Sequence, residues 1–229
     1  VEAFELIPAD ILHVVFHHFP EIPQPLATRG AMNVLMEIGS SNPASGIADD
    51  SGETPLQTIM QETLATAFED GLVIDATIAA SEAQRNALWD VRENAPESHK
   101  RSRGVARSDI SLAQSSLAPF YEDMVAAVKA VDPTIRICGY GHLGDGNLHF
   151  NLVADERSNS EFDSKKDQLY ELIYEHVAKY NGSISAEHGI GQTKRAQLAK
   201  VKAPEVLDVM RAIKASIDPK NLMNPGKVI

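Results

Sequence analysis

The chain is poor in cysteine and in positive charge. Cys138 is its only cysteine, so no disulfide can form within the chain, and we expect a reducing, intracellular compartment. Lysine and arginine total 21 against 32 acidic residues, which gives a formal net charge of −11. A nucleic-acid backbone requires a basic surface to release its counterions. The sequence therefore argues against nucleic acid as a partner.

Long apolar runs are also missing. No segment has the length and hydropathy of a membrane-spanning helix, and no charged-plus-apolar signal peptide is recognisable. We expect a cytoplasmic protein, or one of an organellar matrix in a eukaryote. The 229 residues are 43% hydrophobic, which is enough for a sizeable core.

The order of periodic segments predicts the fold class. Strands are separated by helices and by one hairpin, without regular crossover repeats. We predict an α+β fold, a mostly antiparallel sheet with helices packed on one side. The expected helices are 8–19, 54–69, 81–92, 119–131, 160–180, 194–200 and 204–217, and the expected strands are 31–38, 73–78, 107–112 and the two arms of a hairpin at 136–153.

The hairpin carries the first of two unusual motifs. Residues 139–149 read Gly-Tyr-Gly-His-Leu-Gly-Asp-Gly-Asn-Leu-His, and Asp145-Gly146 is a signal for a two-residue turn. Folding about that turn places His142 opposite His149, with Cβ atoms about 4.5–5.5 Å apart. Two imidazoles at that separation can bind one divalent ion.

The second motif supplies a carboxylate. Residues 185–191 read Ser-Ala-Glu-His-Gly-Ile-Gly, and Glu187 would complete a set of two histidines and one carboxylate with positions open for substrate. A lone histidine is more often structural than ligating, but here turn chemistry, register and a glycine-flanked Glu-His pair agree. Residues 139–144 also match Gly-x-Gly-x-x-Gly literally. We reject a nucleotide site there because a hairpin, not a helix, follows.

These motifs resemble those of a known family. Gly-His-Leu-Gly-Asp-Gly-Asn-Leu-His at 141–149 and Ala-Glu-His-Gly-Ile-Gly at 186–191 are its most specific runs. They are similar to the FAD-linked oxidases of the vanillyl-alcohol-oxidase type, in the D-2-hydroxyglutarate and D-lactate dehydrogenase branch. The supporting segments fall in the family's order at 4–6, 34–39, 89–93, 109–111 and 218–227.

The resemblance implies a ferredoxin-like cap domain that binds substrate, over residues 1–217. The tail, residues 218–229, is expected to reach the flavin or its domain, with Asn224 as the candidate contact. No segment resembles the FAD-binding domain, so the chain alone is expected to be inactive. The face that this domain would cover should be apolar when exposed, and we expect it to promote a homodimer.

The resemblance also suggests substrate-binding residues. Arg92 and Arg107 match positions that bind the substrate carboxylate, a task that suits a guanidinium fork, although composition alone favours surface salt bridges. Asn151 shares a strand face with His149 and is a second candidate, while Asn147 is equally well explained as a turn residue. The family pattern differs at two positions, with lysine at Arg107 and a hydroxyl residue at Pro96. Both concern the distal end of the substrate.

A mechanism follows as a hypothesis. A D-2-hydroxy acid would chelate the ion held by His142, His149 and Glu187, His188 would accept the hydroxyl proton, and the C2 hydride would pass to FAD. Zinc is the metal that the resemblance implies, while manganese or iron suits the same ligands. The flavin would be reoxidised by an electron-transferring flavoprotein, a quinone or a cytochrome.

Two alternatives remain at this point. A non-catalytic, metal-dependent carboxylate-binding module or accessory subunit would use the same ligands without needing a base at His188. A hydrolytic metalloenzyme would need the metal but no flavin.

Overall fold

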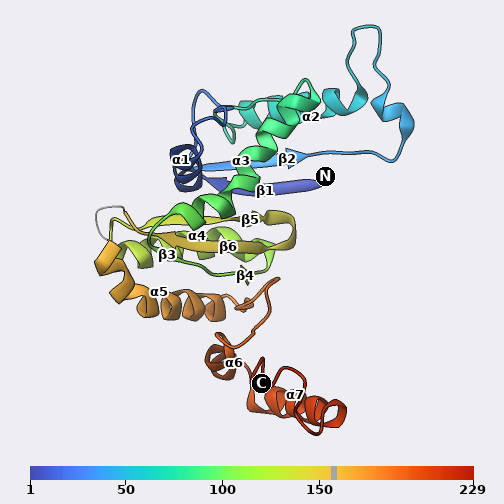
Figure 1. Cartoon of the computed structure of the whole chain (residues 1–229). Coiled ribbons are helices and arrows are strands. Elements are labelled where there is room, and N and C mark those ends of the chain that lie inside the picture. Colours follow the sequence, from blue (N-terminus) through green and yellow to red (C-terminus); the bar gives the residue numbers. More distant parts are fainter. Residues whose placement is uncertain (156–158) are drawn as a thin grey trace. The chain divides into compact units, whose positions relative to one another are not determined.

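The chain divides into two compact units. The structure is a computed structural model that describes residues 1–155 and 159–229 (Figure 1). The first unit comprises Val1–Arg103 and Cys138–Gly144, and the second comprises Gly104–Ile137 and Asp145–Ile229. Within the described ranges, no helix combines the length and the apolar character needed to cross a bilayer.

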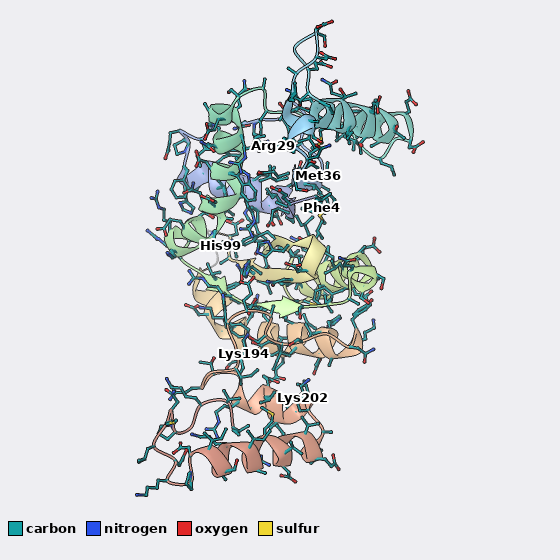
Figure 2. The ribbon with its side chains drawn as sticks, turned by 90° about the vertical axis from the view of Figure 1, so that its right-hand side faces the viewer. Phe4, Arg29, Met36, His99, Lys194 and Lys202 are labelled. Carbon is teal, nitrogen blue, oxygen red and sulfur yellow. The ribbon has the colours of Figure 1, made fainter. Side chains whose placement is uncertain are left out.

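Strand β1 (Ala3–Pro8) is the central strand of the first unit. It pairs antiparallel with β2 (Met32–Glu37) on one side and with β5 (Arg136–His142) on the other. Phe4 is opposite Met36 in the first pairing, and Figure 2 shows these two side chains next to each other. Glu5 is opposite His142 in the second pairing. This register brings a buried acidic side chain beside a candidate metal ligand.

The helices of this unit are α1 (Ala9–His18), the short 3-10 helix η1 (Pro43–Gly46), α2 (Pro55–Glu69) and α3 (Glu82–Arg101). The predicted starts at Thr54 and Ser81 are confirmed, since both side chains cap their helices, Thr54 in a capping box. The predicted end of the third helix near residue 92 is wrong. α3 continues past Pro96: Val91 and Ala95 are buried, and the helix packs against α1.

The predicted strand at residues 73–78 is also wrong. The structure has no strand there, and Ile74 is 63% exposed. The segment is held through the Asp75 carboxylate, which accepts a hydrogen bond from the backbone N–H of Thr28 at 2.8 Å. It borders an apolar cavity of about 920 Å³ together with residues of β2 and α2. Residues 73–78 are rich in β-branched side chains, but no neighbouring strand pairs with them, so they form a loop.

The second unit is built on β6 (Asn147–Val153). β3 (Val105–Ala106) and β4 (Ile110–Ser111) both pair antiparallel with β6 in the same register, as one interrupted strand. The predicted strand at residues 107–112 is thus found only in part. Within each unit the strands described above pair antiparallel, and helices form much of the remainder. The α+β prediction is confirmed.

Four helices complete the second unit: α4 (Gln114–Val131), α5 (Asn159–Lys179), α6 (Arg195–Val201) and α7 (Pro204–Ile217). α4 packs against α5, and α5 lies along β3 (Figure 1). In the core, the rings of Phe120 and Phe150 pack edge to face with their centroids 5.4 Å apart. All four helices match predicted ones, although α4 begins five residues earlier than expected.

The hairpin turn differs from its prediction. The 3-10 turn η2 (Leu143–Asp145) is followed by Gly146 at φ 68°, so the loop has four residues rather than two. The carbonyl of Gly146 accepts a hydrogen bond from the N–H of Leu112 at 2.9 Å, which extends the β4–β6 pairing to the turn. The two-residue turn at Asp145-Gly146 was therefore wrong. The predicted position of His142 opposite His149 stays a prediction.

Candidate functional site

Asp109 is the centre of the candidate site in the second unit. The shared register of β3 and β4, continued through the interruption, places Asp109 opposite His149. Asp109 is 2% exposed. Its Oδ2 atom accepts backbone hydrogen bonds from Ala186 at 3.1 Å, Glu187 at 2.9 Å and His188 at 2.9 Å. One carboxylate oxygen thus holds the segment that carries the Glu-His pair.

The imidazoles gather around the same carboxylate. Oδ1 of Asp109 lies 3.9 Å from Nδ1 of His149, and Oδ2 lies 3.9 Å from Nδ1 of His188. The two rings stack with centroids 5.8 Å apart. The side chain of His149 is 17% exposed and that of His188 is 67% exposed. His188 therefore presents its ring at the open side of the site.

Asn147 joins the site from the start of β6. Its Nδ2 atom donates a hydrogen bond to Oε1 of Glu187 at 2.5 Å. Among the described residues, its Oδ1 atom is buried without a hydrogen-bond partner, and so is Oδ1 of Asp109. Buried oxygens in this state are costly and require a donor or a cation. Asn147 is thus the first residue of β6 rather than a turn residue, and it holds the carboxylate of Glu187.

Electrostatics keep the central carboxylate charged. Burial raises the pKa of Asp109, but hydrogen bonds from the backbone N–H groups of His188 and Glu187 outweigh it, so the pKa stays below its usual value. Lys194 is close by, and burial lowers the pKa of its ammonium group. Its Nζ atom donates to the carbonyl of Ile184 at 2.8 Å. Figure 2 places Lys194 at the start of α6.

The residues present fit a divalent metal. Asp109, His149 and His188 each offer one ligand atom, and these atoms lie within 4.8 Å of one another. Imidazole nitrogen with carboxylate oxygen is a donor set that suits zinc, manganese or iron. The two unsatisfied oxygens of Asp109 and Asn147 are a second indication. Of the three ligands expected from sequence, His149 and Glu187 belong to this unit, and His142 belongs to the first.

Glu5 is the centre of a second cluster, in the first unit. Its Oε2 atom accepts a hydrogen bond from Nε of Arg92 at 2.7 Å, and its Oε1 atom pairs with Nδ1 of His142 at 2.6 Å. Glu5 is 3% exposed. A carboxylate on Nδ1 leaves Nε2 as the ring atom of His142 that can bind a metal. The sequence argument did not select Glu5.

Arg92 is 8% exposed, and its guanidinium carbon lies 4.9 Å from the centre of the Tyr140 ring. Within the described residues, the guanidinium donates a hydrogen bond through Nε alone, to Glu5. The two Nη groups can therefore still serve a ligand. Composition alone favoured a surface salt bridge for Arg92. Its ion pair with Glu5 is instead buried.

The other substrate candidates lie in the second unit. The same register places Arg107 opposite Asn151. Arg107 is exposed, and its backbone N–H donates to the hydroxyl of Tyr170 at 3.1 Å. Asn151 is 5% exposed, and its Oδ1 atom accepts the N–H of Ser108 at 3.1 Å. Asn151 thus anchors the interruption between β3 and β4. Its role toward a substrate stays a prediction.

The C-terminal tail returns to the loop that follows Glu187 and His188. The N–H of Val228 donates to the carbonyl of Gly191 at 2.8 Å. Asn224 has a φ of 47°, and its carbonyl accepts the N–H of Lys227 at 3.3 Å. The predicted contact of Asn224 with flavin stays a prediction.

The sequence matches a described family over residues 46–228, the FAD linked oxidases, C-terminal domain. The chain belongs to this family. Residues 46–228 of this FAD-linked oxidase domain contain Asp109, His149, Glu187 and His188, so the site in the second unit lies within the matched range. The resemblance seen in the motifs is confirmed.

Several relatives of this FAD-linked oxidase domain are curated enzymes. The D-2-hydroxyglutarate dehydrogenase of Stutzerimonas stutzeri (strain A1501) is 34% identical over 91% of the chain and 42% of its own length. The mitochondrial D-2-hydroxyglutarate dehydrogenases of Bos taurus and Arabidopsis thaliana are 33% and 31% identical, over 100% of the chain and 39% and 38% of their own lengths. The chain thus spans about two fifths of these relatives.

A solved structure shows the same fold. The crystal structure of p-cresol methylhydroxylase with substrate bound aligns with 98% of the chain and 46% of that protein's chain, at a TM-score of 0.58 and 12% sequence identity. At this identity the likeness concerns the fold alone.

Proposed function

We propose that the chain is the substrate- and metal-binding domain of a flavin-dependent dehydrogenase that oxidises D-2-hydroxy acids of the 2-hydroxyglutarate or lactate kind. The observation that carries the proposal is the cluster of His149, Glu187 and His188 around the carboxylate of Asp109. The relatives named D-2-hydroxyglutarate dehydrogenases support the reaction class and the substrate class.

His142, His149 and Glu187 would hold the divalent ion, with zinc first among the candidates. His188 could also offer a ligand atom, but in this proposal it acts as the base. The ion supplies Lewis-acid chemistry that lowers the pKa of a hydroxyl group, and FAD, bound mainly by another domain, supplies the hydride acceptor. The carboxylate of Glu5 would keep His142 oriented through Nδ1. Asn147 would fix the carboxylate of Glu187 in the same way.

The residues around the ion would bind the substrate and take its proton. The Nη groups of Arg92 would bind the substrate carboxylate as a fork, while Arg107 and Asn151 would contact its other end. The exposed ring of His188 would accept the proton of the 2-hydroxyl group as the C2 hydride leaves. The 2-hydroxy acid loses one proton and one hydride and becomes a 2-oxo acid.

The partners follow from this role. The domain would work with its own FAD-binding domain, the tail that contains Asn224 would contact the flavin or that domain, and an electron-transferring flavoprotein, a quinone or a cytochrome would reoxidise the flavin. We also propose that the protein forms a homodimer. Two relatives are named mitochondrial, which supports an organellar matrix for a eukaryotic protein and the cytoplasm for a bacterial one.

The role of His188 separates a dehydrogenase from a binding module. In the holoenzyme, which joins this chain to its FAD-binding domain, we expect His188→Asn to lower kcat for D-2-hydroxyglutarate by about 10²–10⁴-fold, with a much smaller change in substrate affinity. Stopped-flow reduction of the flavin measures the chemical step. D-lactate and L-2-hydroxyglutarate are compared in the same assay.

His176→Asn is the matched control. His176 lies on α5, and its Nδ1 atom pairs with the carbonyl of Leu172 at 2.8 Å. Its substitution should leave kcat unchanged. If His188→Asn keeps wild-type turnover, the proposed base is wrong. If the holoenzyme binds carboxylates but never reduces its flavin, the chain is a carboxylate-binding module instead.

A further inference from the structure

The segment that carries the Glu-His pair has little structure of its own. Residues 185–191 lie outside every helix and strand, and both Gly189 and Gly191 have a positive φ. Within the segment, the hydroxyl of Ser185 donates a hydrogen bond to the carbonyl of Gly189 at 2.8 Å. The backbone of the segment is therefore ordered mainly by contacts from outside it.

Asp109 supplies that outside contact. Three consecutive N–H groups, from Ala186 to His188, converge on its Oδ2 atom, although these residues lie more than 75 positions away in the sequence. Hydrogen bonds to a charged acceptor are the stronger kind. The carbonyl of Asp109 also lies 3.4 Å from Nζ of Lys194, which bonds to Ile184 just before the segment. Asp109 thus binds the first half of the segment directly, and it is linked through Lys194 to the residue that precedes the segment.

The second oxygen of Asp109 faces a histidine. Oδ1 is buried without a hydrogen bond among the described residues, and Nδ1 of His149 lies 3.9 Å from it. This distance allows a charge interaction and is too long for a hydrogen bond. Histidines that bind metals usually donate their other N–H to a carboxylate, which fixes the ring and the tautomer. Oδ1 is placed for that function.

We propose that Asp109 is the positioning residue of the site: Oδ2 fixes the backbone that presents Glu187 and His188, and Oδ1 orients His149 so that Nε2 is its ligand atom. The inference rests on the proposed function for the metal and adds the residue that organises its ligands. Asp109 itself touches neither substrate nor flavin in this scheme.

Two substitutions separate the two oxygens. Asp109→Ala removes both, so the amide protons of residues 186–188 should exchange at least tenfold faster. Asp109→Asn keeps the size and one oxygen. If that oxygen stays with the backbone donors, the amide NH2 faces His149 and favours the tautomer with a protonated Nε2. Zinc affinity should then fall about 10–100-fold while exchange at 186–188 changes less.

The experiment uses the full chain. Hydrogen exchange resolved to residues 185–191 measures the order of the segment, and competition with a chromophoric chelator measures zinc affinity. Asp132→Asn is the matched control, because Asp132 is also buried in the second unit and accepts hydrogen bonds from Thr134 and Lys165. It should lower stability but leave zinc affinity and exchange at 186–188 at wild-type values.

The outcomes are distinct. Unchanged exchange in Asp109→Ala, or zinc affinity in Asp109→Asn within threefold of wild type, would overturn the inference. If Asp109→Ala does not fold, Asp109→Asn carries both measurements. A wild-type chain that binds no zinc would remove the metal from the proposed function, and the exchange comparison would still decide whether Asp109 holds the segment.

Discussion

Glu5 and Asp109 are acidic residues that the fold buries, and each has several neighbours that stabilise its charge. Glu5 pairs with Arg92 and His142, and Asp109 accepts three backbone N–H groups. An unpaired charge in such a position would cost far more than folding could supply. Both carboxylates therefore have a defined structural task, and both lie beside residues that the sequence nominated for chemistry.

The Glu5 cluster makes a prediction at this scale. In Glu5→Gln, a neutral amide replaces the carboxylate and leaves the charge of Arg92 buried without its partner. We expect a loss of about 3–5 kcal/mol in the free energy of unfolding, measured by urea denaturation. Glu37→Gln is the control, because the Arg85–Glu37 pair in the same unit is half exposed on the arginine side. Its loss should be clearly smaller, and equal losses would contradict this account of Glu5.

Single residues of the site were predicted from sequence only in part. His149, Glu187 and His188 were named because imidazole and carboxylate side chains next to glycine suggest metal chemistry. Asp109 was not selected, because its function depends on backbone N–H groups, which every residue type except proline carries. The segment 109–111 was noted only as support for the family resemblance, and the register opposite His149 required β3 and β4 to be known.

The elements of secondary structure were predicted best where local signals were strong. Thr54 and Ser81 marked two helix starts through their side chains, and the structure has both caps. The strand at residues 73–78 failed because β-branched residues do not make a strand without a partner. The third helix was predicted to end at residue 92, but α3 continues past Pro96, since tertiary packing of α3 outweighs one lost backbone hydrogen bond.

The turn between β5 and β6 makes a prediction for an element. A Cβ atom on Gly146 would lie 1.9 Å from the carbonyl oxygen of Leu112, and φ is 68°. Neither the backbone oxygen nor the turn can move without breaking the bond from Leu112 to Gly146. Gly146→Ala should therefore destabilise the chain by more than about 1 kcal/mol in thermal unfolding.

Gly144 provides the comparison in the same turn. A Cβ atom there meets no atom of the described residues within 4 Å. Gly144→Ala should leave the melting temperature nearly unchanged. Equal melting temperatures for the two variants would show that the turn adapts, and that its conformation is not set by the contact with Leu112.

On the scale of the whole molecule, the chain is acidic, yet the charged form of some of its carboxylates is strongly stabilised by neighbouring groups. Two of them lie in the second unit and have a pKa of about 2, against a usual 3.8. The hydroxyl of Thr134 and the ammonium group of Lys165 lower the pKa of Asp132. For Asp218 the largest cause is Lys214, followed by the backbone N–H of Met223.

The low pKa values of Asp132 and Asp218 predict how the stability of the chain depends on pH. Each is a carboxylate whose pKa is lower in the folded chain than in the unfolded chain. Its contribution is therefore fully present above pH 3.8 and is lost as the pH falls toward 2. We expect the melting temperature of the chain to drop steeply between pH 4 and pH 2. In the double variant Asp132→Asn/Asp218→Asn, the melting temperature should start lower and should fall less steeply between pH 4 and pH 2.

Asp208→Asn removes one exposed carboxylate as a control for net charge, and its profile should run parallel to the wild type. A double variant with the wild-type slope would mean that other carboxylates govern acid unfolding, and the low pKa values of Asp132 and Asp218 would then have no measurable effect on the stability of the molecule.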